Sequence, residues 1–159
     1  MALAEAFLIL HLLGVFIMAG AAGLTNVTAF AAGRTTNPAT VVTLLDLQVN
    51  TERIGTTLGA VIAIVFGSAL VEEVGYDFGD YWITFAYILW IVALGIDHGM
   101  FIPWNRQVRK HAAQLVEDGV EHSETLRDQV RALKPTLIGL ALDGMLFFFI
   151  FLMVVKPGA

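Results

Sequence analysis

Four long apolar stretches separated by short polar segments form the main pattern of this chain. They cover about residues 6–32, 54–71, 82–103 and 135–155. A helix needs about 20 apolar residues to cross a hydrocarbon core that is roughly 30 Å thick, and each stretch is near or above that length. The pattern predicts an all-α polytopic membrane protein, a four-helix transmembrane bundle that forms one domain over residues 1–159.

Composition supports a membrane protein and excludes several other classes. Hydrophobic residues make up 57% of the chain and charged residues only 14%, with a mean hydropathy of +0.75. A soluble domain of this size could not bury so much apolar surface. The absence of cysteine removes disulfides, thiolate metal sites and iron–sulfur ligation. A net charge of −5 without a basic soluble region gives no support to nucleic-acid binding.

The positive residues predict the orientation in the membrane. Two of them, Arg34 and Arg53, lie between the first two stretches, and six more lie in residues 105–134, so eight of the nine fall on one side. Lys and Arg near span ends are retained on the cytoplasmic side. We therefore expect both termini to lie outside the cytoplasm.

Two polar segments should form helical extensions in the cytoplasm. Asn37 followed by Pro38 is typical of a helix start, so the second span should begin well before its apolar part. Residues 105–134 predict two short amphipathic helices broken near Asp118 and Gly119, with Ser123 as the cap of the second. This segment could either bind a partner or lie over the bundle.

Small residues recur every fourth position in the second span, at Gly55, Gly59, Ala63 and Gly67. Such a stripe lets the backbone of another helix approach closely. The pattern predicts one buried face on this helix. The partner helix could belong to the same chain or to a second copy in a homodimer.

In the half of the bundle nearest the termini, the candidate ligands are His11, Met18 and Met153. His11 and Met153 should lie at similar depth, which suits a His/Met site for haem b or copper, and Met18 lies on the same helical face as His11 and could extend a path for Cu(I). His98 is a further candidate ligand, but a depth offset of about 15 Å disfavours one haem held by both histidines. The alternative for His11 is a hydrogen bond to a neighbouring helix.

A second candidate site lies nearer the cytoplasmic side and comprises Arg53, Asp97, His98 and Asp143. Ionisable groups at membrane depth are costly and usually face the bundle interior. We expect Asp143 to pair with His98, and Asp97 to pair with Arg53 or Thr56. The cluster could relay a proton, bind a ligand, or only join helices through polar contacts.

No catalytic residues are predicted. The sequence has no Gly-x-Ser-x-Gly, no Gly-rich phosphate loop and no His-Glu-x-x-His. An enzyme with its own substrate is therefore less expected than a binding or structural protein.

Three features resemble a known family. They are Leu10-His11-Leu12-Leu13-Gly14, the Arg-bearing helix that leads into a small-residue span, and the closing Met153-Val154-Val155-Lys156-Pro157-Gly158. Over nearly the whole chain they resemble a family of predicted four-span bacterial integral membrane proteins classed as a domain of unknown function. The first-span His-x-x-Gly is also similar to the copper-resistance protein D membrane domain and to haem-binding membrane protoporphyrinogen oxidases, which implies a ligand role for His11 alone.

Two functional hypotheses follow from the sequence. The favoured one is an accessory or structural subunit that docks in the bilayer on a membrane-complex partner or forms a homodimer. The alternative is a haem- or copper-binding protein for electron or metal transfer that uses His11 together with the Asp97, His98 and Asp143 cluster.

Overall fold

The computed structural model describes residues 2–158, and these are helical except for short connections. The elements in chain order are α1 (Ala2–Ala32), α2 (Pro38–Thr51), η1 (Glu52–Thr56), α3 (Thr57–Val74), α4 (Tyr81–Ile96), η2 (Asp97–Phe101), α5 (Ile102–Glu117), α6 (Glu124–Val130) and α7 (Leu133–Val155). The two η segments are π-helical turns inside longer helices. The predicted all-α class is confirmed.

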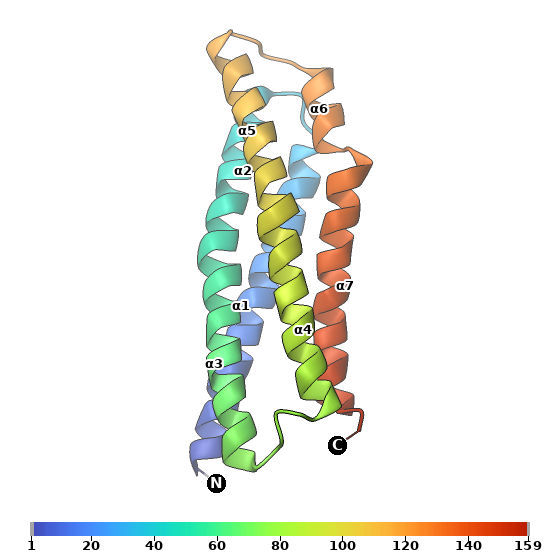
Figure 1. Cartoon of the computed structure of the whole chain (residues 1–159). Helices are drawn as coiled ribbons and strands as arrows, with labels where there is room; N and C mark the ends of the chain where they lie inside the picture. The colour runs from blue at the N-terminus through green and yellow to red at the C-terminus, as the bar shows by residue number, and fades with distance from the viewer. Residues whose placement is uncertain (1, 159) are drawn as a thin grey trace.

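The elements line up as four long rods that run alternately up and down (Figure 1). The rods are α1, then α2–η1–α3, then α4–η2–α5, then α6–α7. Each contains a helix long and apolar enough to cross a membrane. Both described chain ends lie at the end of the bundle that carries the α3–α4 connection, while the other two connections lie at the opposite end.

The predicted helix starts and breaks are confirmed. The Asn37 side chain accepts a hydrogen bond from the Thr40 amide at 3.0 Å, directly before Pro38 at the first helical position. The Ser123 hydroxyl caps α6 by accepting from the Leu126 amide at 3.2 Å. Between α5 and α6 the chain turns at Gly119, whose φ of +73° favours glycine.

One boundary differs from the prediction. The first amphipathic helix of the 105–134 segment is the direct continuation of the third span, because α4, η2 and α5 follow each other without a break. Pro103 lies near the start of α5, directly after the π turn. Because the rod is continuous, the missing N–H of Pro103 leaves one carbonyl of the preceding turn without its helical donor, and this preceding turn is the π turn Asp97–Phe101.

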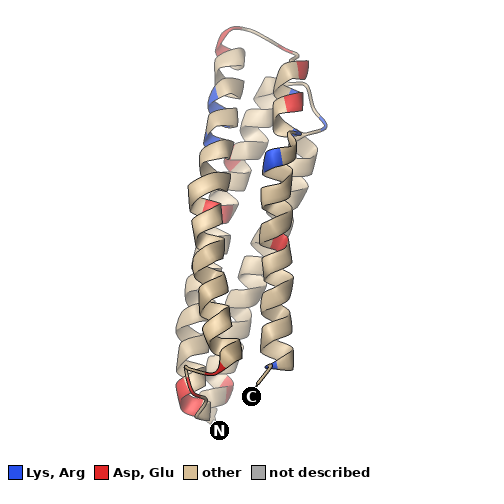
Figure 2. Ribbon diagram, turned by 45° about the vertical axis from the view of Figure 1, so that its right-hand side comes forward, with Lys and Arg blue, Asp and Glu red and all other residues tan. Residues whose placement is uncertain are grey.

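A small apolar core joins α2, α5 and α6 beyond the apolar spans. It consists of Val41, Leu45, Val108, Ala112 and Leu126, all buried. Asp46 and Arg109 add a two-pronged ion pair between α2 and α5. Lys and Arg are concentrated toward this end of the molecule (Figure 2). The 105–134 segment therefore packs against α2 instead of projecting freely.

The small-residue stripe packs within the chain, against α1. A Cβ added at Gly14 would lie 2.5 Å from the Ala63 backbone nitrogen, and one added at Gly59 would lie 2.7 Å from the Met18 nitrogen. Distances this short leave no room for any side chain, so α1 and α3 touch backbone to backbone. The stripe is thereby used inside one molecule.

Candidate functional site

A cavity of about 380 Å³ lies in the half of the bundle that carries the termini. We call it the large cavity. The helix pair α1 and α3 forms one wall, and α4 and α7 form the other. Its lining is mainly apolar and aromatic, and the side chains with polar or sulfur atoms are His11, Met18, Ser68, Tyr76, Trp82, Tyr87, Trp90, Met153 and Lys156.

The His11 imidazole is held in a defined tautomer. Its Nδ1 lies 2.7 Å from the Ala63 carbonyl oxygen on α3. A carbonyl can only accept, so Nδ1 carries the proton and donates it. The neutral ring then keeps its lone pair on Nε2. The predicted hydrogen bond from His11 to a neighbouring helix is confirmed, and it leaves a nitrogen able to ligate a metal.

Gly67 makes room for this ring. A Cβ built at Gly67 would lie 2.8 Å from His11 Nδ1 and 3.1 Å from Cε1. The imidazole therefore packs against the Gly67 backbone, one helical turn from the Ala63 carbonyl that it contacts. Gly67 thus leaves space for the His11 ring, whereas Gly55 and Gly59 leave space for the close contact between α1 and α3.

The structure brings together some of the sequence-predicted ligands and separates others. His11, Met18 and Met153 all line the large cavity. His98 does not line it, and its side chain is 54% exposed. The predicted depth difference between the two histidines agrees with this separation.

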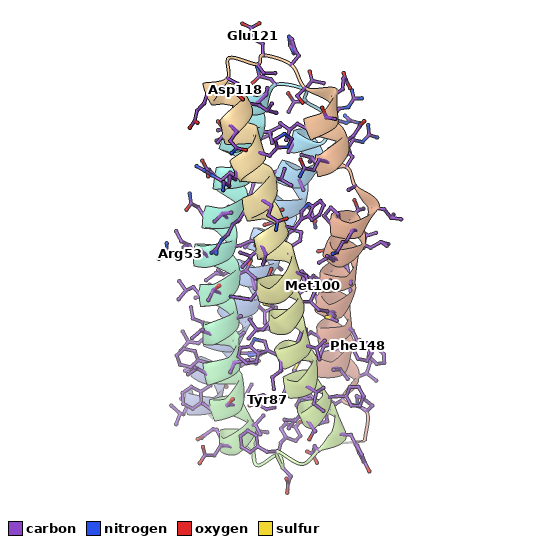
Figure 3. All side chains as sticks on the ribbon, turned by 45° about the horizontal axis from the view of Figure 1, so that its top comes forward. Arg53, Tyr87, Met100, Asp118, Glu121 and Phe148 are labelled. Atoms are coloured by element: carbon purple, nitrogen blue, oxygen red, sulfur yellow. The ribbon has the colours of Figure 1, made fainter. Side chains whose placement is uncertain are left out.

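The end of the large cavity nearest the termini is closed by polar and aromatic side chains. Lys156 Nζ donates to the Tyr76 hydroxyl at 2.9 Å, and it lies 4.8 Å and 5.5 Å from the ring centroids of Tyr76 and Trp82. Deeper in the cavity, the hydroxyls of Ser68 and Tyr87 are 2.5 Å apart. Tyr87 lies in the half of the bundle that carries the termini (Figure 3). These contacts tie α3, α4 and the end of α7 together.

A second cavity of about 120 Å³ lies next to the first, toward the far end of the bundle. We call it the acidic cavity, because Glu52, Asp97 and Asp143 line it from three different rods. Thr25, Asn26 and Thr56 also line it. The Asn26 amide donates to Asp143 at 2.9 Å, which joins α1 to α7. Glu52 and Asp97 are the first residues of η1 and η2.

The predicted pairings of Asp143 with His98 and of Asp97 with Arg53 or Thr56 are wrong. Asp143 binds Asn26, and His98 Nδ1 lies 3.2 Å from Asp97 on the same π turn. Arg53 is exposed and lies at the edge of the bundle (Figure 3). The reason is the direction of successive residues, which differ by about 100° around a helix. Glu52 faces the cavity, so its neighbour Arg53 points outward.

Glu52 is the functional candidate that our sequence reasoning missed. It is only 8% exposed. The signal was present in the stripe, because Glu52 precedes Gly55 by three residues and Gly59 by seven, and these spacings share a helical face. The cluster predicted from the sequence contains the neighbouring Arg53 in its place.

The acidic cavity is not a ready multidentate metal site. Within residues 2–158, no three His, Asp or Glu side chains come close enough together to hold one metal ion.

Comparison with known proteins identifies a family. The model of the family described as "Predicted integral membrane protein (DUF2269)" matches residues 5–157. No curated protein and no solved structure matches the chain, and these comparisons do not show the similarity to the copper-resistance protein D domain. The chain belongs to the DUF2269 family of predicted integral membrane proteins.

Proposed function

We propose that this protein binds haem b in the large cavity, with His11 Nε2 as an axial ligand to the iron. The observation that carries the proposal is the hydrogen bond from His11 Nδ1 to the Ala63 carbonyl. Histidines that ligate metals commonly donate their other ring N–H to a carbonyl or carboxylate, which fixes the ring and makes the free nitrogen a better ligand. His11 has this arrangement and lines a cavity.

The size and lining of the cavity favour a cofactor over a bare ion. Sites for small molecules and cofactors have volumes of about 300–1,000 Å³ and are mostly apolar with a few polar groups, and the large cavity is in this range at about 380 Å³. Met153 on α7 lies on the wall opposite His11 and is the proposed second ligand, since His/Met ligation is a known haem arrangement. Lys156 at the end of the cavity could pair with a carboxylate of the cofactor.

Copper is the second candidate for the same site. His11, Met18 and Met153 offer imidazole and thioether donors, which Cu(I) accepts. A single copper ion would need these donors drawn tightly together, and most of the cavity would then remain unfilled. With no cysteine in the chain, any haem must be held without thioether bonds to the protein.

The proposed location is the bacterial inner membrane, with both termini outside the cytoplasm. The support is the charge distribution, since basic residues gather at the end of the bundle opposite the termini (Figure 2). In this orientation the large cavity lies in the outer half of the membrane, on the side from which an extracytoplasmic electron partner would approach.

An accessory or structural subunit of a membrane complex, or a homodimer, is the competing hypothesis. Its support is that α7 buries few side chains within the chain and leaves Phe147 and Phe151 exposed. Lipid tails cover such a face equally well, so this observation is weaker than the His11 geometry.

The test is the ultraviolet-visible spectrum of gently purified protein, oxidised and dithionite-reduced, with iron and copper analysis of the same sample. The proposal predicts a Soret band and iron in a one-to-one ratio to the chain. Copper in that ratio without a Soret band would select the second candidate. A colourless, metal-free sample that also fails to take up added haemin would refute both and favour an accessory subunit.

A further inference from the structure

The acidic cavity is lined by two carboxylates that come from π-helical turns on separate rods. Glu52 begins η1 and Asp97 begins η2, and both line the cavity. Single π turns inside α-helices occur frequently at functional sites. Two such turns place acidic side chains on the same cavity from separate rods.

No basic side chain lines this cavity in the described part of the chain. On the same rod as Glu52, Arg53 is exposed and points away. On the rod of Asp97, His98 reaches Asp97 from outside the cavity, with more than half of its side chain exposed. From α7, Asp143 adds a third acid that is already bound to Asn26 of α1. The Glu52 carboxylate therefore faces acids and neutral groups only.

A buried hydroxyl beside Glu52 also lacks a partner. Thr25 on α1 is 7% exposed and lines the same cavity. Its hydroxyl lies near the Glu52 carboxylate. The hydroxyl makes no hydrogen bond with any described residue. Buried polar groups are nearly always satisfied by protein or by ordered water. A volume of about 120 Å³ has room for water.

We propose that the acidic cavity is a proton-binding site in which Glu52 and Asp97 share one exchangeable proton. Two carboxylates that line one cavity at membrane depth, with no basic side chain in its lining and with His98 beside Asp97 from outside, repel each other unless a proton or another cation separates them. A shared proton removes one negative charge, and the Thr25 hydroxyl can then donate to the carboxylate that stays ionised. The two acids should titrate as a pair instead of as separate groups. This proposal does not depend on the His11 site.

The test is infrared spectroscopy of the purified full chain in lipid nanodiscs over a pH series in H2O and D2O. A protonated carboxyl has a C=O stretching band that a carboxylate lacks. We expect one such band at neutral pH, which shifts in D2O and disappears as the pH rises. Either Glu52→Gln or Asp97→Asn should abolish it. Thr25→Val should move its frequency, because the hydroxyl lies beside the carboxyl pair.

A matched variant shows whether loss of the infrared band comes from loss of the proton site or from a general effect on folding. Glu73→Gln changes an exposed acid at the end of α3, far from the acidic cavity, and should leave the band unchanged. Circular dichroism and gel filtration show whether each variant is folded. The proposal is overturned if the wild type has no protonated carboxyl band, if the band neither titrates nor exchanges, or if it persists in folded Glu52→Gln or in folded Asp97→Asn. Loss of the band on adding sodium chloride, but not choline chloride, at constant pH would also overturn it by assigning the site to sodium.

Discussion

His11 and Gly67 face each other across the contact between α1 and α3, with the histidine ring lying where a glycine Cβ would be. That Cβ would come within 2.8 Å of Nδ1. The same nitrogen donates to Ala63, one turn away. The orientation of the His11 ring thus depends on Gly67, which has no side chain to occupy this space.

Gly67→Ala should displace the His11 ring and break its hydrogen bond to Ala63. Alanine is favoured over glycine in a helix by about 1 kcal/mol, so any loss must come from the contact with the ring. We expect weaker cofactor binding and an unchanged or lower melting temperature, measured by the Soret absorbance per chain and by thermal unfolding in detergent. Gly20→Ala on α1 is the control, because nothing lies within 4 Å of its added Cβ. Full cofactor retention in Gly67→Ala would contradict the proposed role of the glycine.

The Ser68–Tyr87 hydrogen bond is expected to stabilise the contact between α3 and α4. Hydrogen bonds between membrane helices contribute about 0.6 kcal/mol on average and up to about 1.7 kcal/mol. Ser68→Ala and Tyr87→Phe should each lower the free energy of unfolding, and the double variant should cost about 1 kcal/mol less than the sum. Tyr81→Phe changes an exposed tyrosine and is the control. Strict additivity would show that the 2.5 Å contact contributes nothing.

Asn26→Leu should destabilise the fold by leaving Asp143 without its partner. Asn26 is exposed and Asp143 is half-buried, so the cost should be near the roughly 0.6 kcal/mol average of hydrogen bonds between membrane helices, whereas replacing both partners by apolar residues can be nearly neutral. We therefore expect Asp143→Leu to rescue the Asn26→Leu variant in thermal unfolding. Asn50→Leu, at an exposed position on α2, is the comparison. Failure of the second substitution to restore stability would mean that the pair does not join α1 to α7.

Single cysteines can report the orientation, since the natural chain has none. Glu73 lies at the end of α3, on the side of the termini, and Glu121 lies in the connection at the opposite end (Figure 3). Both residues are exposed. In intact spheroplasts, a membrane-impermeant maleimide should label Glu73→Cys and spare Glu121→Cys until the membrane is opened. The reverse labelling would place both termini in the cytoplasm.

Much of the fold could be predicted because its signals are local. The apolar runs, the Asn37–Pro38 start, the Ser123 cap and the break at Gly119 each depend on a few neighbouring residues, and all are confirmed. The stripe of small residues also predicted a buried face correctly. Which helix would cover it could not be predicted from spacing alone, since α1 and a second copy were both compatible.

The pairings around the acidic cavity were not predictable from ordinary helical periodicity. A π turn adds a residue to the turn, so every later side chain is rotated by about 100° relative to a regular α-helix. Both η1 and η2 occur at this cavity. Similar depth along the bundle, from which Asp143 was paired with His98, therefore does not decide which side chains meet. His98 faces outward beside Asp97, and Asp143 binds Asn26.

The measurement that tests the central claim most directly is the reduced-minus-oxidised spectrum of wild type, His11→Ala and His98→Ala, purified in parallel. The two variants each remove one histidine at membrane depth, but only His11 lines the large cavity. The account predicts a haem spectrum in wild type and His98→Ala and its loss in a folded His11→Ala protein. An unchanged haem spectrum in His11→Ala, or no chromophore and no uptake of haemin in the wild type, would contradict it.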